Sequence, residues 1–141
     1  MEVVINRQYG GFGLSIKAQK YYLALIGKEM FLYDIEKWRH EEGGPKYVKV
    51  SESDTKKYFC LMVLTKDLGE ETNDLPDEFF FIDSDIERSD PNLIKTVRDL
   101  GLDANGDYAE LKIVNIPDGT KYVIHEYDGM ESVEEAHNSW S

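Results

Sequence analysis

The chain of 141 residues has only one cysteine, four prolines and three histidines. A single cysteine, Cys60, excludes an internal disulfide and a thiolate metal cluster. No stretch approaches the roughly eighteen uninterrupted apolar residues of a membrane helix, and residues 1–5 lack the basic start of a signal peptide. We therefore expect a soluble intracellular protein with no membrane partner.

Sequence patterns that mark catalysis are scarce as well. The histidines have no partner at the spacing of a zinc pair, and no Gly-x-Ser-x-Gly nucleophile pattern occurs. The acidic segments 83–87 and 103–107 lack the closing carboxylate of a calcium loop. We expect no catalytic residues, no metal site and no cofactor. Because 28 acidic residues could converge anywhere in the fold, an enzyme stays open as an alternative.

Net charge is unevenly distributed along the chain, because most acidic residues lie in residues 51–141. The formal net charge is −12, with +2 in residues 1–50 and −14 in residues 51–141. The acidic segment 67–90 holds ten carboxylates and one cation, Arg88. It would repel phosphates, so we expect no direct contact with nucleic acid. It is either a solvated face or a surface that binds a basic site on a host protein, as a DNA mimic does.

The composition is typical of one folded domain spanning residues 1–141. Apolar residues make up 41% of the sequence and aromatic residues 12%, which is enough for a packed core. Local patterns predict strands at 3–5, 30–34, 47–50 and 58–65, while 79–82 is another strand or an aromatic plug. Residues 110–116 and 122–127 predict a hairpin that turns at 117–119.

Three helices are expected from capping residues and from apolar spacing. The first runs from the cap Ser15 to about Ile26, the second from Asp90-Pro91 to Gly101, and the third from about Met130 to Trp140. The predicted fold class is α+β, with a largely antiparallel sheet of about five to six strands and three helices.

Three closely spaced glycines, Gly10, Gly11 and Gly13, follow the first expected strand and lead into the helix capped by Ser15. Such glycines let the backbone adopt positive φ and approach a ligand, while the first helical N–H groups favour a bound anion. The spacing matches neither a P-loop nor the dinucleotide fingerprint. The segment is therefore either a ligand loop or a tight turn.

Charged and aromatic side chains accompany this glycine loop. Arg88 either pairs internally with Asp85 or Asp90 or binds an anionic ligand. Tyr127 and Trp140 would add stacking rings if the C-terminal hairpin and helix close over the loop. The candidate ligand-binding residues are Arg7, Tyr9, Gly11, Phe12, Gly13, Ser15, Arg88, Tyr127 and Trp140.

Several segments carry a resemblance to a known group of proteins. They are residues 88–94, 104–106, 111–118 and 126–129, together with a Val-Ile-Asn strand followed by Tyr-Gly-Gly-Phe-Gly-Leu-Ser. These segments resemble small uncharacterised accessory proteins of bacteriophages and prophages, which also end shortly after a tryptophan. Residues 28–80 are unmatched. The resemblance implies a protein that acts in the cytoplasm of a host bacterium, where such proteins often blunt host defences; it transfers no catalytic residue.

Two hypotheses follow for the function. The first is a binding protein that sequesters a phosphate-bearing, nucleotide-like signal of a bacterial defence system, without catalysis. Pockets of that kind are commonly built between subunits, so a homo-oligomer would favour it. The second is an acidic inhibitor that binds a host protein through residues 67–90. A phosphodiesterase-type enzyme that degrades the signal would use the same pocket and differ only by turnover.

Overall fold

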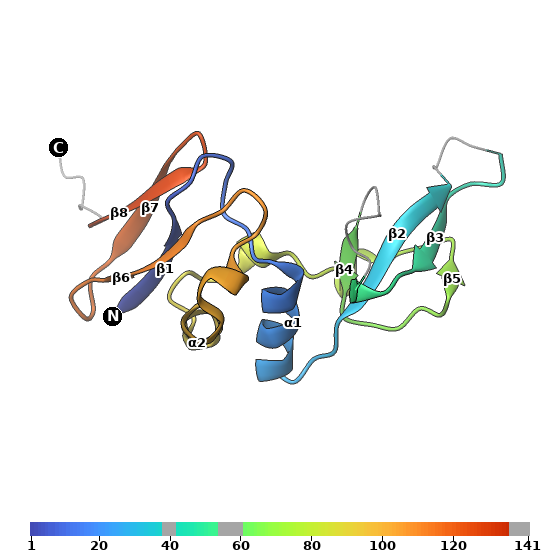
Figure 1. The fold of residues 1–141 in the computed structure, drawn as a ribbon, viewed down its shortest axis with the longest axis horizontal. Helices are drawn as coiled ribbons and strands as arrows, with labels where there is room; N and C mark the ends of the chain where they lie inside the picture. Colours follow the sequence, from blue (N-terminus) through green and yellow to red (C-terminus); the bar gives the residue numbers. More distant parts are fainter. Residues whose placement is uncertain (38–41, 54–60, 136–141) are drawn as a thin grey trace. The chain divides into compact units, whose positions relative to one another are not determined.

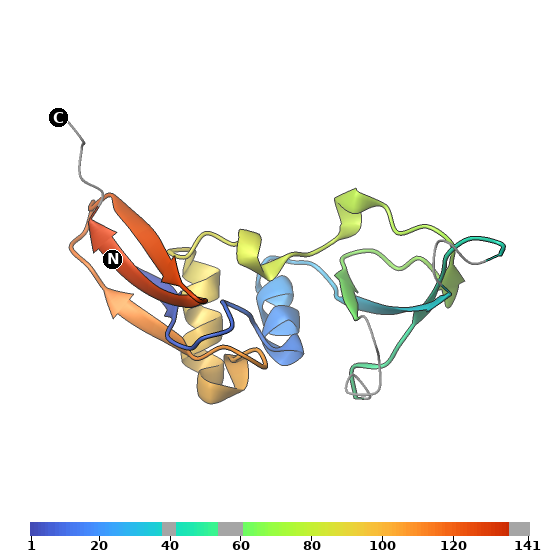
Figure 2. The same cartoon turned by 90° about the horizontal axis from the view of Figure 1, so that it is seen from above.

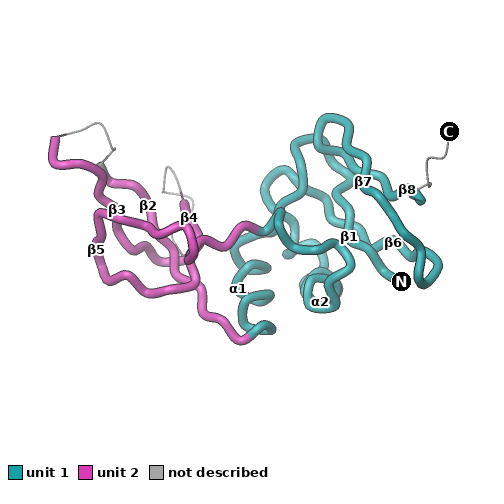
Figure 3. Tube along the Cα trace, turned by 180° about the vertical axis from the view of Figure 1, so that it is seen from behind, with its two compact units in different colours: residues 1–26, 83–141 teal, residues 27–82 magenta. Residues whose placement is uncertain are grey.

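The computed structural model describes residues 1–37, 42–53 and 61–135, and the chain divides into two compact units. Unit 1 comprises Met1–Ile26 and Asp83–Ser141, and unit 2 comprises Gly27–Ile82 (Figure 3). In the sequence, unit 2 is therefore an insertion that follows the first helix of unit 1. Residues 1–141, expected as one domain, contain both units.

Unit 1 contains two antiparallel strand pairs. The first joins β1 (Glu2–Asn6) to β6 (Leu111–Asn115), and the second joins β7 (Tyr122–Tyr127) to β8 (Met130–Glu135). The β7–β8 turn consists of Asp128 and Gly129, whose φ angles are 50° and 87°. Two successive positive φ angles are what a two-residue type I′ turn requires. The Asp-Gly pair therefore sets the hairpin.

Two α-helices of unit 1 confirm the predictions made from their capping residues. Helix α1 (Ile16–Leu25) begins after Ser15, whose Oγ accepts from the Ala18 N–H at 3.1 Å. Helix α2 (Pro91–Leu100) begins after Asp90, whose carboxylate accepts from the Asn92 N–H at 2.8 Å. Both caps satisfy a backbone donor that has no partner inside the helix. Among the described residues, no helix has the length and apolar character to cross a bilayer.

The core of unit 1 lies between its helices and the β1–β6 sheet. Helix α2 packs against both strands, and α1 packs against α2 (Figures 1 and 2). The fully buried side chains include Val3 and Val4 of β1, Leu23 of α1 and Leu93 of α2. Buried residues recur at three- and four-residue spacing in both helices, so each helix presents one face to the core. They are Ala18, Gln19, Tyr22 and Leu23 in α1 and Leu93, Ile94, Thr96 and Val97 in α2.

Unit 2 is built around one antiparallel sheet with the strand order β4-β2-β3-β5. The strands are β2 (Phe31–Lys37), β3 (Lys46–Lys49), β4 (Met62–Leu64) and β5 (Glu71–Thr72). Its core contains Tyr33, Leu64 and Leu75. The Tyr33 hydroxyl accepts from the Leu68 N–H and donates to the Gly69 carbonyl, both at 2.8 Å. One buried tyrosine thus fixes the loop after β4.

Short 3₁₀ helices occupy parts of the chain where the sequence suggested strand or loop. They are η2 (Asp77–Phe79), η3 (Asp83–Asp85) and η4 (Gly101–Ala104). Phe80 forms an isolated bridge with Leu64, so segment 79–82 contacts β4 without being a full strand. Of the predicted strand 58–65, Met62–Leu64 is observed as β4, and residues 58–60 lie outside the described residues.

The predicted fold class is wrong in its sheets and helices. The described residues form eight strands in sheets of two, four and two, with two α-helices and short 3₁₀ helices. The predicted hairpin of 110–116 with 122–127 is also wrong, because β6 pairs with β1 and β7 pairs with β8.

The third predicted helix is replaced by strand β8 over Met130–Glu135, and the rest of its range lies outside the described residues. Met130 and Val133 are spaced as a helix requires. A strand could use the same residues once the Asp128-Gly129 turn placed them beside β7.

Candidate functional site

The glycine loop of residues 7–13 lies against the tip of the β7–β8 hairpin. The Gly10 N–H donates to the Asp128 carbonyl at 3.0 Å, and Nδ2 of Asn6 donates to the Gly129 carbonyl at 2.7 Å. A Cβ on Gly129 would lie 2.2 Å from the Gly11 nitrogen, so only glycine fits at this turn. The β7–β8 hairpin therefore contacts the loop. The stacking role expected of Tyr127 also involved a C-terminal helix, which strand β8 replaces.

Three exposed tyrosines lie next to this contact. Tyr9 is 55% exposed, Tyr127 is 76% exposed and Tyr108 is 75% exposed. Tyr9 precedes Gly10 and Tyr127 precedes Asp128, while a Cβ on Gly10 would lie 2.7 Å from the Tyr108 Cβ. Sequence reasoning did not select Tyr108. The available signal was an aromatic residue in the polar segment 105–110.

Arg7 lines a cavity together with residues of both strands of the hairpin. Its Nη1 donates to the Glu131 carbonyl at 2.7 Å, and within the described ranges Arg7 makes no ion pair. The remaining guanidinium N–H groups are thus available for a ligand. The cavity measures about 200 Å³ and is lined by Arg7, His125, Glu126, Tyr127, Met130, Glu131 and Ser132.

Arg88, the second predicted anion-binding cation, is occupied by an internal partner. Its Nη1 and Nη2 bind the two carboxylate oxygens of Glu131 at 2.6 and 2.9 Å. Glu131 is 4% exposed and also accepts from the Asn6 N–H at 2.8 Å. The observed partner is Glu131 in place of Asp85 or Asp90.

The Arg88 guanidinium also lies 3.7 Å from the centroid of the Phe12 ring. One face of that ring is thereby covered by a cation, an arrangement that stabilises both side chains. Arg88 and Phe12 therefore hold the glycine loop and the hairpin in place.

The segment just before α1 already has an anionic partner, Asp83. The Leu14 N–H donates to the Asp83 carboxylate at 2.8 Å, and the Ser15 N–H donates to the Ala104 carbonyl at 3.0 Å. Ser15 Oγ donates to the Asp103 carbonyl at 2.6 Å while it caps the helix. Ser15 therefore supports the turn into α1.

Two further candidate residues have no demonstrated place at the cavity. The Gly13 carbonyl accepts from the Gly106 N–H at 2.9 Å, so Gly13 contacts a neighbouring loop. Trp140 lies outside the described residues.

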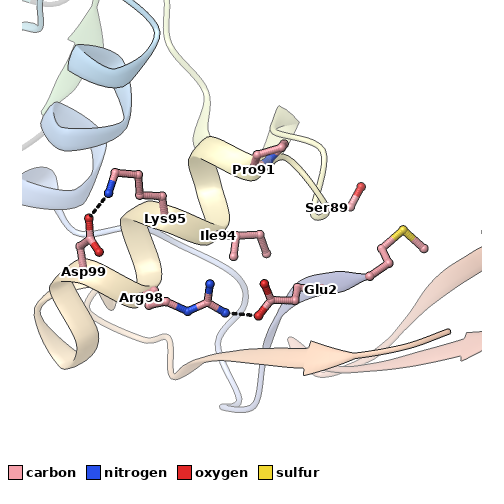
Figure 4. A pocket seen from close by; sticks show the side chains of 8 residues that line it. Glu2, Ser89, Pro91, Ile94, Lys95, Arg98 and Asp99 are labelled. Atoms are coloured by element: carbon pink, nitrogen blue, oxygen red, sulfur yellow. Dashed lines mark hydrogen bonds and ion pairs between the residues drawn. The ribbon is translucent and has the colours of Figure 1, made fainter. Parts of the chain in front are cut away.

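A larger cavity of about 550 Å³ lies between β1 and α2 (Figure 4). Lys95 and Arg98 line it, but Lys95 pairs with Asp99 at 2.9 Å and Arg98 pairs with Glu2. Hydrogen bonds from the Tyr21 hydroxyl and from Lys95 lower the pKa of Asp99. An anion would have to displace one of these carboxylates. The smaller cavity beside Arg7 is therefore the candidate site.

The acidic segment 67–90 is divided between the two units, with 67–82 in unit 2 and 83–90 in unit 1. Several of its carboxylates have internal partners. Asp67 binds Lys49, Glu71 lies 3.4 Å from Lys46, and Glu87 accepts from the Tyr122 hydroxyl. This segment therefore includes structural carboxylates as well as solvated ones.

Comparisons with known proteins add no relative. No family model matches the chain, and neither a curated protein nor a solved structure is similar enough to count as a match. Among the described residues, no three His, Cys, Asp or Glu side chains are grouped so as to hold a metal ion.

Proposed function

We propose that this chain is a non-enzymatic protein that binds and sequesters a phosphate-bearing, nucleotide-like signalling molecule. The observation that carries the proposal is that Arg7 and Tyr127 line one cavity, with the exposed Tyr9 and Tyr108 on the adjoining loops. Aromatic faces stack on bases, and a guanidinium binds phosphate through two parallel hydrogen bonds. In the phage setting implied by the resemblance, this would be a counter-defence protein of the host cytoplasm.

The two arginines have different roles in this proposal. Arg7 contacts the phosphate, because its guanidinium is exposed and the described residues provide no carboxylate for it. Arg88 is a positioning residue, because Glu131 neutralises it and Phe12 covers one of its faces. Gly11 and Gly13 let the loop lie close to its neighbours, and Ser15 holds the turn into α1.

The charge and size of the cavity limit the ligand. Glu126 and Asp128 are exposed beside it, so a ligand with many negative charges would be repelled. This favours a phosphodiester over a triphosphate. A volume of about 200 Å³ is below the usual range for a whole ligand, so one base or one sugar phosphate would enter the cavity. The rest of the molecule would lie across Tyr9 and Tyr108.

The test identifies what the purified protein retains from a cell. The protein is incubated with lysate from bacteria whose defence signalling has been triggered, washed and heat-denatured, and the supernatant is analysed by mass spectrometry. We expect an intact nucleotide, with retention reduced roughly tenfold or more in Arg7→Ala and Tyr127→Ala. Arg98→Ala and Leu102→Ala are matched controls, because they remove an exposed arginine and an exposed apolar side chain elsewhere in unit 1.

Two other results would contradict the proposal. A signal that is cleaved by the protein would show an enzyme. A supernatant without any nucleotide, under conditions in which a known binder scores, would favour the acidic-inhibitor hypothesis. A complex made through the acidic segment should weaken steeply as salt concentration rises, whereas binding in the cavity should depend less on salt.

A further inference from the structure

Among the described residues, the outer edge of β7 has no strand paired to it. β7 pairs there with β8 alone, and Tyr127 opposite Met130 closes the two-residue hairpin. In such a hairpin the closing pair exchanges hydrogen bonds, so the backbone groups of Tyr122, Ile124 and Glu126 point away from β8. No backbone hydrogen bond within the described ranges uses these outward groups.

The other sheet edges in the described residues are shorter than β7 or are partly engaged by other groups. On the outer edge of β8 the Glu131 carbonyl accepts from Nη1 of Arg7 at 2.7 Å. In unit 2 the edge strands β4 and β5 have three and two residues. In β1 the outward N–H groups of Val4 and Asn6 donate to the Arg88 carbonyl and to Glu131. In β6 the outward N–H of Leu111 donates to Asn105 Oδ1 at 2.8 Å.

Proteins usually protect an edge strand with lysine, proline, a bulge or a very short length. β7 has six residues, the sequence Tyr-Val-Ile-His-Glu-Tyr and an uninterrupted register with β8. It has no lysine, proline or bulge, and Glu126 is its one carboxylate, so it is suited to pair with a strand that places no second carboxylate opposite Glu126.

We propose that β7 pairs with β7 of a second copy of this chain, so that the two hairpins form one four-stranded antiparallel sheet. In the register centred on Ile124, Val123 faces the partner's His125 and Tyr122 faces the partner's Glu126. Tyr127 then faces the partner's Lys121, a pair in which the cation can lie over the ring. No like charges face each other here, whereas a register centred on Glu126 would oppose two glutamates.

The side chains on the outer face of β7 link this register to the candidate site. Val123, His125 and Tyr127 share the outer face, because alternate residues point to the same side of a strand. His125 and Tyr127 line the cavity beside Arg7. Pairing therefore brings the partner's Lys121 to the rim of that cavity and adds a second cation to it. The pairing itself does not rest on the proposed function, because oligomeric state is measured without ligand.

The first test measures the mass of the full-length chain by size-exclusion chromatography with light scattering over a series of concentrations. We expect a dimer that tightens with added salt, because each copy carries a net charge of −12 and salt screens the repulsion. Val123→Lys should weaken dimerisation tenfold or more by adding a charge to the edge. It should keep the hairpin, because position 123 lies opposite Glu134 in β8.

Asn115→Lys is the matched control, because it adds the same charge to an exposed position of β6 and should leave the dimer intact. A monomer at every concentration would overturn the proposal and leave the edge to a strand of some other protein. A Val123→Lys variant that dimerises as tightly as the parent would also overturn it.

The second test determines the register by crosslinking. Val123→Cys and His125→Cys chains, each also carrying Cys60→Ser, are mixed and oxidised with diamide. Facing residues at a non-hydrogen-bonded position have Cα atoms about 4.5 Å apart, which lies within the Cα separation that a disulfide spans. We expect crosslinked dimers from the mixture and few from either variant alone. Equal crosslinking of Val123→Cys by itself would contradict the Ile124-centred register.

Discussion

The two units of this protein are stabilised in different ways. Unit 1 buries aliphatic side chains of two capped helices against a strand pair, with Leu23, Leu93 and Val3 fully buried. Unit 2 has no α-helix among its described residues, and its core is centred on Tyr33 with Phe31, Phe79 and other aromatic rings packed around it. Packing of helices on a strand pair stabilises unit 1, and a core centred on one tyrosine and its aromatic neighbours stabilises unit 2.

The difference extends to the ion pairs. In unit 1, Arg88 pairs with the buried Glu131, and the two side chains are 14% and 5% exposed. The pair connects the segment before α2 to the hairpin. In unit 2, Lys49 and Asp67 form a pair whose carboxylate side is 52% exposed. Buried pairs are expensive to break, and exposed pairs contribute little. The Arg88–Glu131 ion pair therefore helps to position the candidate site in unit 1, whereas the Lys49–Asp67 ion pair of unit 2 lies at the surface.

The largest expected effect comes from breaking the buried pair of unit 1. Glu131→Gln removes the charge that neutralises Arg88, and we expect a loss of about 3–5 kcal/mol in the free energy of unfolding, measured with urea. Asp67→Asn in unit 2 is the control and should change stability little, because that pair faces solvent. Equal effects in the two variants would show that the pairs are energetically alike.

The second effect separates the units directly. Tyr33→Phe removes the hydroxyl that accepts from Leu68 and donates to Gly69, and we expect a cost of about 1–3 kcal/mol. Amide hydrogen exchange, measured peptide by peptide, should speed up in β2 and in residues 66–72. Exchange in α2 should stay unchanged. If α2 exchanges faster by the same factor, the two units unfold as one.

A third prediction concerns alkaline pH and unit 1. Burial, followed by a hydrogen bond to Asp90, raises the pKa of Tyr22 to about 12. The neutral hydroxyl therefore contributes stability that is fully present below about pH 10 and is lost as the pH rises through about 12.

In the Tyr22→Phe variant, the decrease in the unfolding free energy between about pH 10 and pH 12 should be smaller by about 2 kcal/mol. The measurement is urea unfolding at a series of pH values. A fall of the same size in Tyr22→Phe would assign the pH dependence to other groups, such as Tyr122, whose pKa is raised by burial and by Glu87.

The smallest effect should come from adding a charge at the surface of unit 1 away from its buried pair. Leu102 is 84% exposed, so Leu102→Lys should change the unfolding free energy by less than about 0.5 kcal/mol. The same urea titration checks it. A loss of unfolding free energy comparable with that of Tyr33→Phe would contradict the exposed position of Leu102.

Local signals accounted for most elements of unit 1. The strand at 3–5 and the helices after Ser15 and Asp90 appear where they were predicted. The error at 130–135 arose from the same kind of local reasoning. Apolar residues at three- and four-residue spacing indicated a helix, although the Asp128-Gly129 pair just before them is a strong hairpin signal.

The candidate site was predictable only in part. Arg7, Tyr9 and Tyr127 were selected from the sequence, and all three are exposed at one end of unit 1. The partner of Arg88 was missed, because Glu131 is 43 residues away and was assigned to a helix. Tyr108 was missed because its position beside Gly10 depends on a contact between distant loops.

The sequence by itself determined the ends of both helices and the turn of the last hairpin. Capping and turn residues act within about four positions, so their effect is local. Only the tertiary structure decided that β1 pairs with β6 and that Arg88 binds Glu131. Strand pairing and ion pairing join residues that lie far apart in the chain, and many acidic residues or strands could have supplied the partner. The choice depends on which surfaces are brought together when the core is buried.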